Sequence, residues 1–295
     1  MTPILERLLC RIQGWLPQRA LTALVYRLMR IRVRWIKNAQ IRMISRLAGV
    51  NWDEAASANP ADYPTFNAFF TRELKDQARP LDPASDAFLS PCDGRVSETG
   101  PIRDDRLFQA KGREFSLEAL LAGQHDASRW RGGHFATIYL SPRDYHRVHM
   151  PVAGELRRMS FIPGRLFSVA PYTVRHVDNL FAVNERVICE FETELGPLAL
   201  ILVGAMLVNG IETTWAGEIT SRPSRKPFSQ DYGKGHIRLD KGQEMGRFNM
   251  GSTVILLTPD GALGGYEVSA GEAVQLGQKL AAIRPGTLAP RDHQS

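Results

Sequence analysis

Apolar side chains in the first thirty residues recur every three or four positions, the spacing of one face of an α-helix. Pro17 interrupts this pattern and suits the first turn of a second helix. The spacing therefore predicts a pair of amphipathic helices. The apolar positions are Ile4, Leu5, Leu8, Leu9, Ile12, Trp15 and Leu16 in the first helix, and Leu21, Leu24, Val25, Leu28 and Met29 in the second.

From about residue 60 the pattern changes to short apolar runs bounded by Gly, Pro, Asn or Asp, which indicate strands. Two short helices are also expected, an aromatic-rich one within 63–74 with Thr65 as candidate N-cap and another at 116–121. The pattern predicts an α+β fold, with a helical segment at 1–60 and a compact, mainly antiparallel β domain at 61–295. Runs expected as strands are 134–140, 187–191, 198–203, 211–215 and 253–257, and the polar, proline-marked stretch 222–227 is expected as an exposed loop.

Charge is distributed unevenly along the 295 residues. Ten of the 37 Lys and Arg residues lie within residues 1–50, where Glu6 is the only acid, so this segment carries +9. The other 27 basic and 30 acidic side chains nearly cancel. The asymmetry argues against a nucleic-acid-binding surface over the whole domain and indicates an anionic partner for the first segment. Three scattered cysteines indicate neither a disulfide framework nor a zinc site, and favour a reducing compartment.

The N-terminal segment has the features of a membrane-surface anchor. None of its charge-free runs exceeds about ten residues, whereas a spanning helix needs roughly 20. Arginines punctuate the apolar stretch and no small-residue cleavage site follows, unlike in a signal peptide. Helices with Leu, Ile and Trp on one face and Arg on the other suit the plane of an anionic membrane. The simpler alternative is a solvated helix pair packed on the domain core. An arginine-rich nucleic-acid segment and a transit peptide, which would usually carry more serine, are weaker alternatives.

Three segments carry candidate chemistry. Ser252 follows Gly251 at the start of the expected strand 253–257, which alone is typical of an ordinary turn. His146 and His149 stand three apart between prolines, in a segment expected to be extended. Their surroundings match no closed zinc site, so we expect no metal, and a structural role for both histidines is the simple alternative. Asp93 lies in a Pro-x-Asp-Gly sequence, which by composition is first a turn.

Read together, these residues suit self-directed acyl chemistry. A serine hydroxyl becomes a nucleophile when an imidazole takes its proton and a carboxylate orients that imidazole. Attack by Ser252 on the unshielded carbonyl of Gly251 would move the acyl group from nitrogen to oxygen. The product is an ester, which is easier to break than the peptide bond.

Five longer motifs, named below, occur along the chain in the same order as in the bacterial phosphatidylserine decarboxylase proenzymes. The chain resembles this family over nearly all of residues 60–275. Met250 departs from the family, which usually has Leu before Gly-Ser-Thr, but the two side chains are similar in volume and polarity, so we expect processing to survive. The motifs are 69–75 (FFTRELK), 109–112 (QAKG), 116–121 (SLEALL), 179–186 (NLFAVNER) and 241–248 (KGQEMGRF).

The resemblance implies cleavage between Gly251 and Ser252 into a beta chain, 1–251, and an alpha chain, 252–295. Asp93 and His149 would form the charge-relay pair and Ser252 would be the nucleophile. The ester then breaks by β-elimination, and Ser252 loses ammonia to become a covalent pyruvoyl cofactor. Its ketone would form a Schiff base with the amine of phosphatidylserine and act as electron sink when carbon dioxide leaves. His146 is our candidate for proton transfer in that step, because an imidazole titrates near neutral pH.

The resemblance also implies partners and location. The alpha and beta chains would form a heterodimer, and the family implies a homodimer of such pairs. Phosphatidylserine lies in an anionic membrane, so we expect a peripheral membrane protein at the cytoplasmic face of the cell membrane, with no nucleic-acid partner. Two other functions compete: a membrane-associated serine hydrolase using Ser252, His149 and Asp93, and a non-enzymatic lipid-binding module. The first lacks a Gly-x-Ser-x-Gly elbow and the second leaves the histidines without a role.

Overall fold

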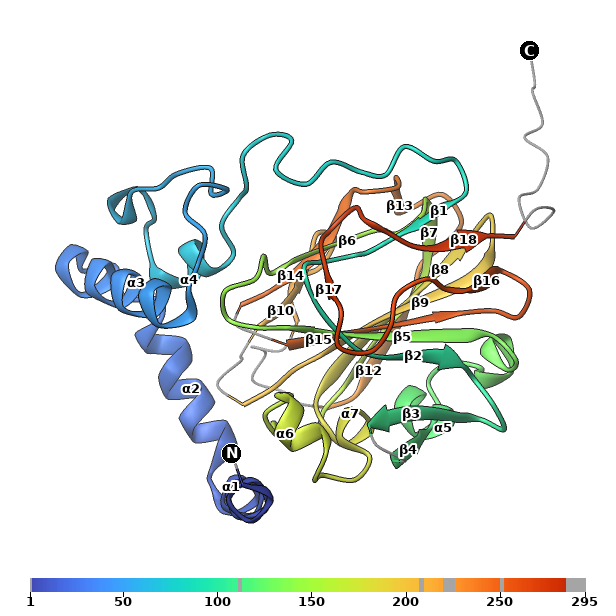
Figure 1. The fold of residues 1–295 in the computed structure, drawn as a ribbon, viewed down its shortest axis with the longest axis horizontal. Helices are drawn as coiled ribbons and strands as arrows, with labels where there is room; N and C mark the ends of the chain where they lie inside the picture. The colour runs from blue at the N-terminus through green and yellow to red at the C-terminus, as the bar shows by residue number, and fades with distance from the viewer. Residues whose placement is uncertain (1, 111–112, 207–209, 220–225, 250–251, 285–295) are drawn as a thin grey trace.

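The N-terminal helices lie along one side of a β-rich body in the computed structural model (Figure 1). The structure describes residues 2–110, 113–206, 210–219, 226–249 and 252–284. The helices are α1 (Pro3–Trp15), α2 (Gln18–Leu28), α3 (Arg34–Ala48), α4 (Phe66–Phe70), α5 (Leu117–Leu121), α6 (Pro171–Val174) and α7 (Leu180–Val183), with 3₁₀ turns η1 (Pro60–Asp62) and η2 (Ala127–Trp130).

The strands pair antiparallel throughout the described sheets, as expected from the sequence. They are β1 (Ala87–Leu89), β2 (Gly94–Pro101), β3 (Arg106–Ala110), β4 (Arg113–Ser116), β5 (His134–Leu140), β6 (Arg147–His149), β7 (Gly154–Ile162), β8 (Arg186–Thr193), β9 (Gly196–Val203), β10 (Ile211–Thr213), β11 (Gly217–Glu218), β12 (Phe228–Asp231), β13 (Arg238–Leu239), β14 (Glu244–Phe248), β15 (Ser252–Thr258), β16 (Leu263–Tyr266), β17 (Ala273–Val274) and β18 (Lys279–Ile283).

A nine-stranded sheet forms the centre of the body. Its order is β12-β7-β8-β9-β15-β5-β2-β17, with β13 also pairing with β7. Smaller sheets are β11-β10-β14-β6, β1-β18-β16 and β3-β4. The α+β fold class is confirmed, and the five expected strands are all present, although β10 ends at Thr213 rather than residue 215.

Strand β15 is covered on both faces of the large sheet. Val254 and Leu256 belong to one hydrophobic cluster, with Phe88 and Met245 of the smaller sheets. Ile255 and Leu257 belong to a second cluster, with residues of α5 and α7. Because both faces are buried, the strand is continuously apolar rather than alternating. This accounts for the run that follows Ser252.

The two short helices form where expected. The Thr65 side chain accepts a hydrogen bond from the Ala68 amide at 3.1 Å, so it caps α4 as predicted. Ser116 caps α5 in the same way. Of the expected loop 222–227, only Lys226 and Pro227 lie within the described residues, and both are exposed.

The N-terminal helix pair is confirmed, but a third helix, α3, was not predicted. Its N-terminal turn falls in the cationic run that follows α2, and it ends at Gly49, whose φ of 74° suits a glycine C-cap. Ile41 of α3 packs in a cluster with Phe66, Phe69 and Phe70. This hydrophobic cluster contains residues from before and after residue 60 in the sequence, the position at which we expected the helical segment to end.

Candidate active site

The three predicted segments meet at one junction of the fold. Asp93 lies in the turn between β1 and β2, and the His149 amide donates to the Pro91 carbonyl of that turn at 2.8 Å. Strand β6, which carries His149, pairs with β14. The chain then runs from β14 to Ser252, which opens β15 opposite Leu140 of β5. Backbone pairing therefore brings together segments about 50 to 160 residues apart in the sequence.

Asp93 is buried and held by an arginine that sequence reasoning missed. Arg79 donates from Nη2 to Oδ2 of Asp93 at 2.6 Å and from Nε to Oδ1 at 2.8 Å. The Leu276 amide donates to the same Oδ1 at 2.9 Å. Arg79 also binds Glu54 at 2.8 Å, which lowers the pKa of that carboxyl. A carboxylate with these donors is fixed in one orientation.

His149 is oriented by a backbone carbonyl rather than by Asp93. Its Nδ1 lies 2.8 Å from the Gly242 oxygen and therefore carries the proton, which leaves Nε2 as an acceptor, 3.3 Å from the Tyr145 hydroxyl. The described hydrogen bonds include none between Asp93 and His149. Burial lowers the pKa of His149, while the hydrogen bond to Gly242 and the charges of Glu244 and Asp93 oppose that shift. His149 is thus a neutral imidazole with a basic Nε2.

His146 is completely buried beside Phe70, at 4.0 Å between ring centroids. Its Nδ1 donates to the Asp144 carbonyl at 2.8 Å, and in the described part of the chain its Nε2 has no hydrogen-bond partner. Burial lowers the pKa of His146 to about 3. The expectation that this imidazole titrates near neutral pH is therefore wrong, because the low-dielectric site disfavours its charged form. It is a neutral base at pH 7.

The proposed cleavage point is only partly described. Gly251 and Met250 lie outside the described residues, and Ser252 is described by its backbone at the start of β15. The residue before them, Asn249, is buried and held on several sides. Its amide donates to Gly210 O at 2.7 Å, and its side chain bonds Asn67 of α4 at 3.0 Å and Glu218 at 3.3 Å. Glu218 in turn binds Arg30, which follows α2, at 2.7 Å.

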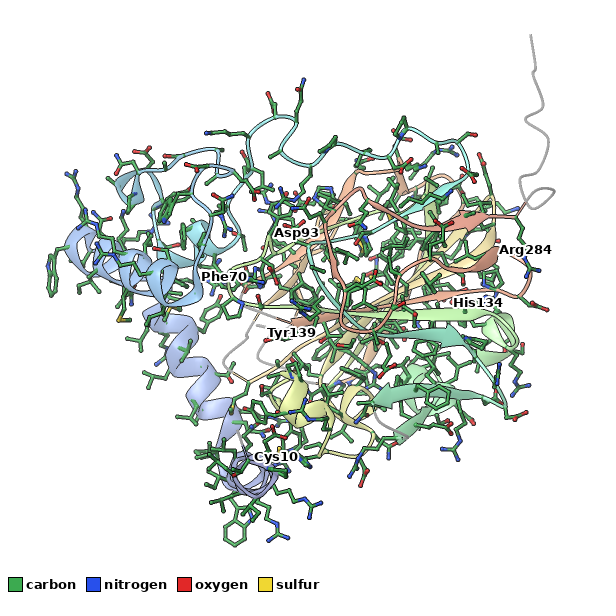
Figure 2. The ribbon with its side chains drawn as sticks, in the orientation of Figure 1. Cys10, Phe70, Asp93, His134, Tyr139 and Arg284 are labelled. Atoms are coloured by element: carbon green, nitrogen blue, oxygen red, sulfur yellow. The ribbon has the colours of Figure 1, made fainter. Side chains whose placement is uncertain are left out.

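A cavity of about 340 Å³ lies at the same junction. Its walls come from the chain around α3 and α4, from the ends of β2 and β5, and from the loop after β17. Figure 2 shows Phe70 of α4 on one side of this junction and Asp93 and Tyr139 on the other. Asp93, Arg72 and Arg79 line the cavity.

Sequence reasoning missed Arg72, Arg79 and Gly242 as parts of the site. Arg72 lies in the motif 69–75, so the motif was a signal for it, but nothing distinguished its charge from those of other arginines. Arg79 and Gly242 meet Asp93 and His149 only through folding. Among the described residues no group of three or more His, Cys, Asp or Glu could hold a metal ion.

A buried carboxylate, two neutral histidines and an arginine-lined cavity at one strand end define the class of protein as an enzyme. A family model described as phosphatidylserine decarboxylase matches residues 66–282, and a second, described as PSD, matches residues 8–49. The chain belongs to the phosphatidylserine decarboxylase family.

Similar proteins cover almost the whole chain. A phosphatidylserine decarboxylase proenzyme of Nitrosococcus oceani is 54% identical over 276 residues, 92% of this chain and 90% of that protein. Proteins of the same name from Pseudomonas fluorescens and Shewanella amazonensis are 50% and 45% identical. They cover 93% and 95% of this chain, and 97% and 99% of their own lengths. The chain therefore corresponds to nearly the full length of these relatives.

Proposed function

We propose that this chain is a precursor that cleaves itself between Gly251 and Ser252 and then decarboxylates phosphatidylserine to phosphatidylethanolamine and carbon dioxide. One observation carries the proposal: in a member of this family, the turn with Asp93, strand β6 with His149 and the entrance of β15 at Ser252 are joined by backbone pairing. A serine hydrolase is less well supported, because Ser252 leads into a strand and not into a helix.

In the proposed cleavage, Nε2 of His149 takes the proton of the Ser252 hydroxyl. The hydroxyl oxygen bonds to the Gly251 carbonyl carbon, and the protonated His149 gives its proton to the amide nitrogen. That nitrogen leaves the carbonyl carbon as the amine of residue 252, which gives the ester. The Gly242 carbonyl keeps the proton of His149 on Nδ1, the orienting role usually given to a carboxylate. The negative charge of Asp93 favours the protonated imidazole that forms.

Elimination then removes the α-proton of residue 252 and breaks its Cβ–O bond, which frees the Gly251 carboxylate. Water replaces the nitrogen of the resulting enamine, ammonia leaves, and the alpha chain begins with a pyruvoyl group. Strand β15 is paired with β5 from Ser252 and with β9 from Thr253, which supports a fixed position for this new terminus. A bound pyruvoyl ketone supplies an attachment point for the substrate amine and an electron sink for decarboxylation.

His146 is our candidate for moving a proton in the decarboxylation step. Its Nε2 is unprotonated, and the negative charge of a bound substrate would raise its lowered pKa. It could then take a proton at Nε2 during substrate attachment and return it to the α-carbon after carbon dioxide leaves. The unpaired state of Nε2 supports this role, because a buried polar atom without a partner is uncommon.

The N-terminal helices support peripheral binding at an anionic membrane, which we place at the cytoplasmic face. Helix α1 turns its polar side inward: Glu6 binds Arg175 and His176 at 2.7 and 3.0 Å. Its apolar side faces outward, with Ile4 and Trp15 81% and 92% exposed. This argues against the alternative in which the apolar side packs on the domain core. No helix in the described part of the chain is long and apolar enough to cross a membrane.

A denaturing gel tests the proposed function. Self-cleavage predicts two bands of about 28 and 5 kDa, from the 33.0 kDa mass divided in the ratio of 251 to 44 residues. Ser252→Ala should give one full-length band and no release of carbon dioxide from phosphatidylserine. A single full-length band in protein that is active would refute the pyruvoyl mechanism.

A further inference from the structure

Arg72 is an unusual group in the wall of the 340 Å³ cavity. Only 4% of the residue is exposed. Its Nη2 donates to the Arg143 carbonyl at 3.1 Å, but its Nε and Nη1 have no acceptor among the described residues. The Phe69 ring lies 5.4 Å from its guanidinium carbon. A buried cation with two unused donor groups is costly, so the Arg72 side chain is suited to a bound anion.

The carboxylates of the cavity are already bound elsewhere. Arg79 binds both Asp93 and Glu54, at 2.6 and 2.8 Å. Asp144 accepts hydrogen bonds from the amide and hydroxyl of Ser141 at 2.6 and 2.8 Å. Arg143, whose side chain is 58% exposed, lies 3.7 Å from Asp144 and lines the same cavity. Among the described residues, Arg72 therefore has no hydrogen-bonded carboxylate, although the charges of Asp93 and Glu54 act on it. It suits a ligand with negatively charged oxygens.

The strand register locates the cavity relative to the reacting residue. Ser252 pairs with Leu140, and the two neighbours of Leu140 in the chain, Tyr139 and Ser141, line the cavity. In phosphatidylserine, only one carbon and one oxygen separate the amine-bearing carbon from phosphorus. A headgroup attached at residue 252 therefore carries its phosphate to within a short distance of that attachment point.

We propose that Arg72 binds the phosphate of the lipid headgroup and is a substrate-binding residue, an inference that rests on the function proposed above. The phosphate is preferred to the carboxylate because an arginine on the carboxylate would stabilise the group that must leave as neutral carbon dioxide. The phosphate keeps its charge throughout the reaction. Its binding is therefore equal in ground and transition states, and its loss raises KM without changing kcat.

The first test uses the full chain carrying Arg72→Gln or Arg72→Lys, assayed with phosphatidylserine in mixed micelles after a denaturing gel has shown normal cleavage. We expect Arg72→Gln to raise KM about 10- to 100-fold, as for loss of a charge-assisted hydrogen bond, with kcat within about twofold of the parent. Arg72→Lys should fall between. Arg158→Gln, which removes an exposed partner of Asp231, is the matched control and should leave both constants unchanged.

The second test needs no variant of the site. Glycerol phosphate should inhibit the cleaved parent enzyme competitively with the lipid, whereas glycerol should not. No inhibition by glycerol phosphate, or an unchanged KM in a cleaved Arg72→Gln protein, would overturn the inference. A fall in kcat at constant KM would assign Arg72 to the carboxylate or to a structural role and would also overturn it.

Two further outcomes distinguish a lipid phosphate from free phosphate, and the role of Arg72 from the proposed function. Inhibition by inorganic phosphate together with an unchanged lipid KM in Arg72→Gln would mean a free-phosphate site, contrary to the headgroup assignment. A parent protein that neither cleaves nor releases carbon dioxide would instead refute the proposed function itself. An active parent with an unaffected Arg72→Gln variant refutes only the role of Arg72.

Discussion

The two histidines of β6 and its preceding turn differ in what surrounds their Nε2 atoms. Nε2 of His149 faces the Tyr145 hydroxyl, whereas Nε2 of His146 belongs to a fully buried ring and has no partner among the residues that the structure describes. Both rings donate from Nδ1 to backbone carbonyls. One nitrogen of each ring therefore has the structural role that was the simple alternative for both histidines. The second nitrogen of each ring is unprotonated and can accept a proton, that of His149 once the Tyr145 hydroxyl gives way.

From this difference we expect the two histidines to act in different steps. His149→Ala should remain one uncleaved chain, because no base then takes the serine proton. His146→Ala should cleave but decarboxylate with kcat about 10²- to 10⁴-fold lower, the usual contribution of general acid–base catalysis. Gels and carbon dioxide release measure the two effects. If both variants remain uncleaved, this division of roles is refuted.

The pKa of His149 sets a pH dependence for cleavage. Burial lowers this pKa below the ordinary 6.5, so the imidazole is neutral and able to accept a proton above about pH 6.5. Cleavage of precursor made by cell-free translation should therefore be independent of pH above 6.5 and slow down only when the pH falls below the lowered pKa. The His146→Ala precursor should show the same profile. A rate that keeps rising well above pH 7 would indicate a different base.

At the scale of elements, the sequence predicts strands better than it predicts the orientation of helices. Strand β5 has the expected bounds, His134–Leu140, because its turn residues and apolar run agree. Helix α3 was not predicted because the charged residues Arg34 and Lys37 interrupt the apolar spacing in its first turn. Lys37 is nevertheless buried, because its ammonium group donates to the Pro60 carbonyl. The inward polar side of α1 was not predictable, since it depends on Arg175 and His176, distant in the sequence.

The outward apolar side of α1 carries a prediction about membranes. Ile4→Ser with Trp15→Ser should reduce binding to anionic vesicles about tenfold or more, because burial of a large apolar side chain contributes about 1.5–3 kcal/mol. Co-sedimentation measures this, and cleavage should be unaffected. Phe108→Ser is the control, as Phe108 is 42% exposed but lies in β3, outside the N-terminal helices. Equal loss in the control, or none in the double variant, would contradict a membrane role for α1.

In the whole molecule, strands of the proposed alpha chain pair with strands of the proposed beta chain. Strand β15 lies between β5 and β9, β17 pairs with β2, and β18 pairs with β1. Val254, Ile255, Leu256 and Leu257 are completely buried. Cleavage at 251–252 would cut the connection from β14 to β15 but leave these pairings and the buried apolar surface in place. The two chains should therefore stay together without a covalent bond, which supports a heterodimer as the mature form.

The sequence could predict only part of the candidate active site. The motifs identified Asp93, His149 and Ser252 as candidates, and the fold joins their segments by backbone pairing. The partners that hold them, Arg79 for Asp93 and Gly242 for His149, come from separate segments. These contacts exist only after long-range pairing, so neither spacing nor composition could predict them.

Intact mass spectrometry of natively purified, active protein shows whether the chain has cleaved itself and formed a pyruvoyl group. We expect one species that co-elutes as a complex in size-exclusion chromatography but separates on denaturation into chains 1–251 and 252–295. The small chain should be lighter by one ammonia than the same chain beginning with an unmodified serine. A single intact chain of 33.0 kDa in active protein, or a small chain with an unmodified N-terminal serine, would contradict the account.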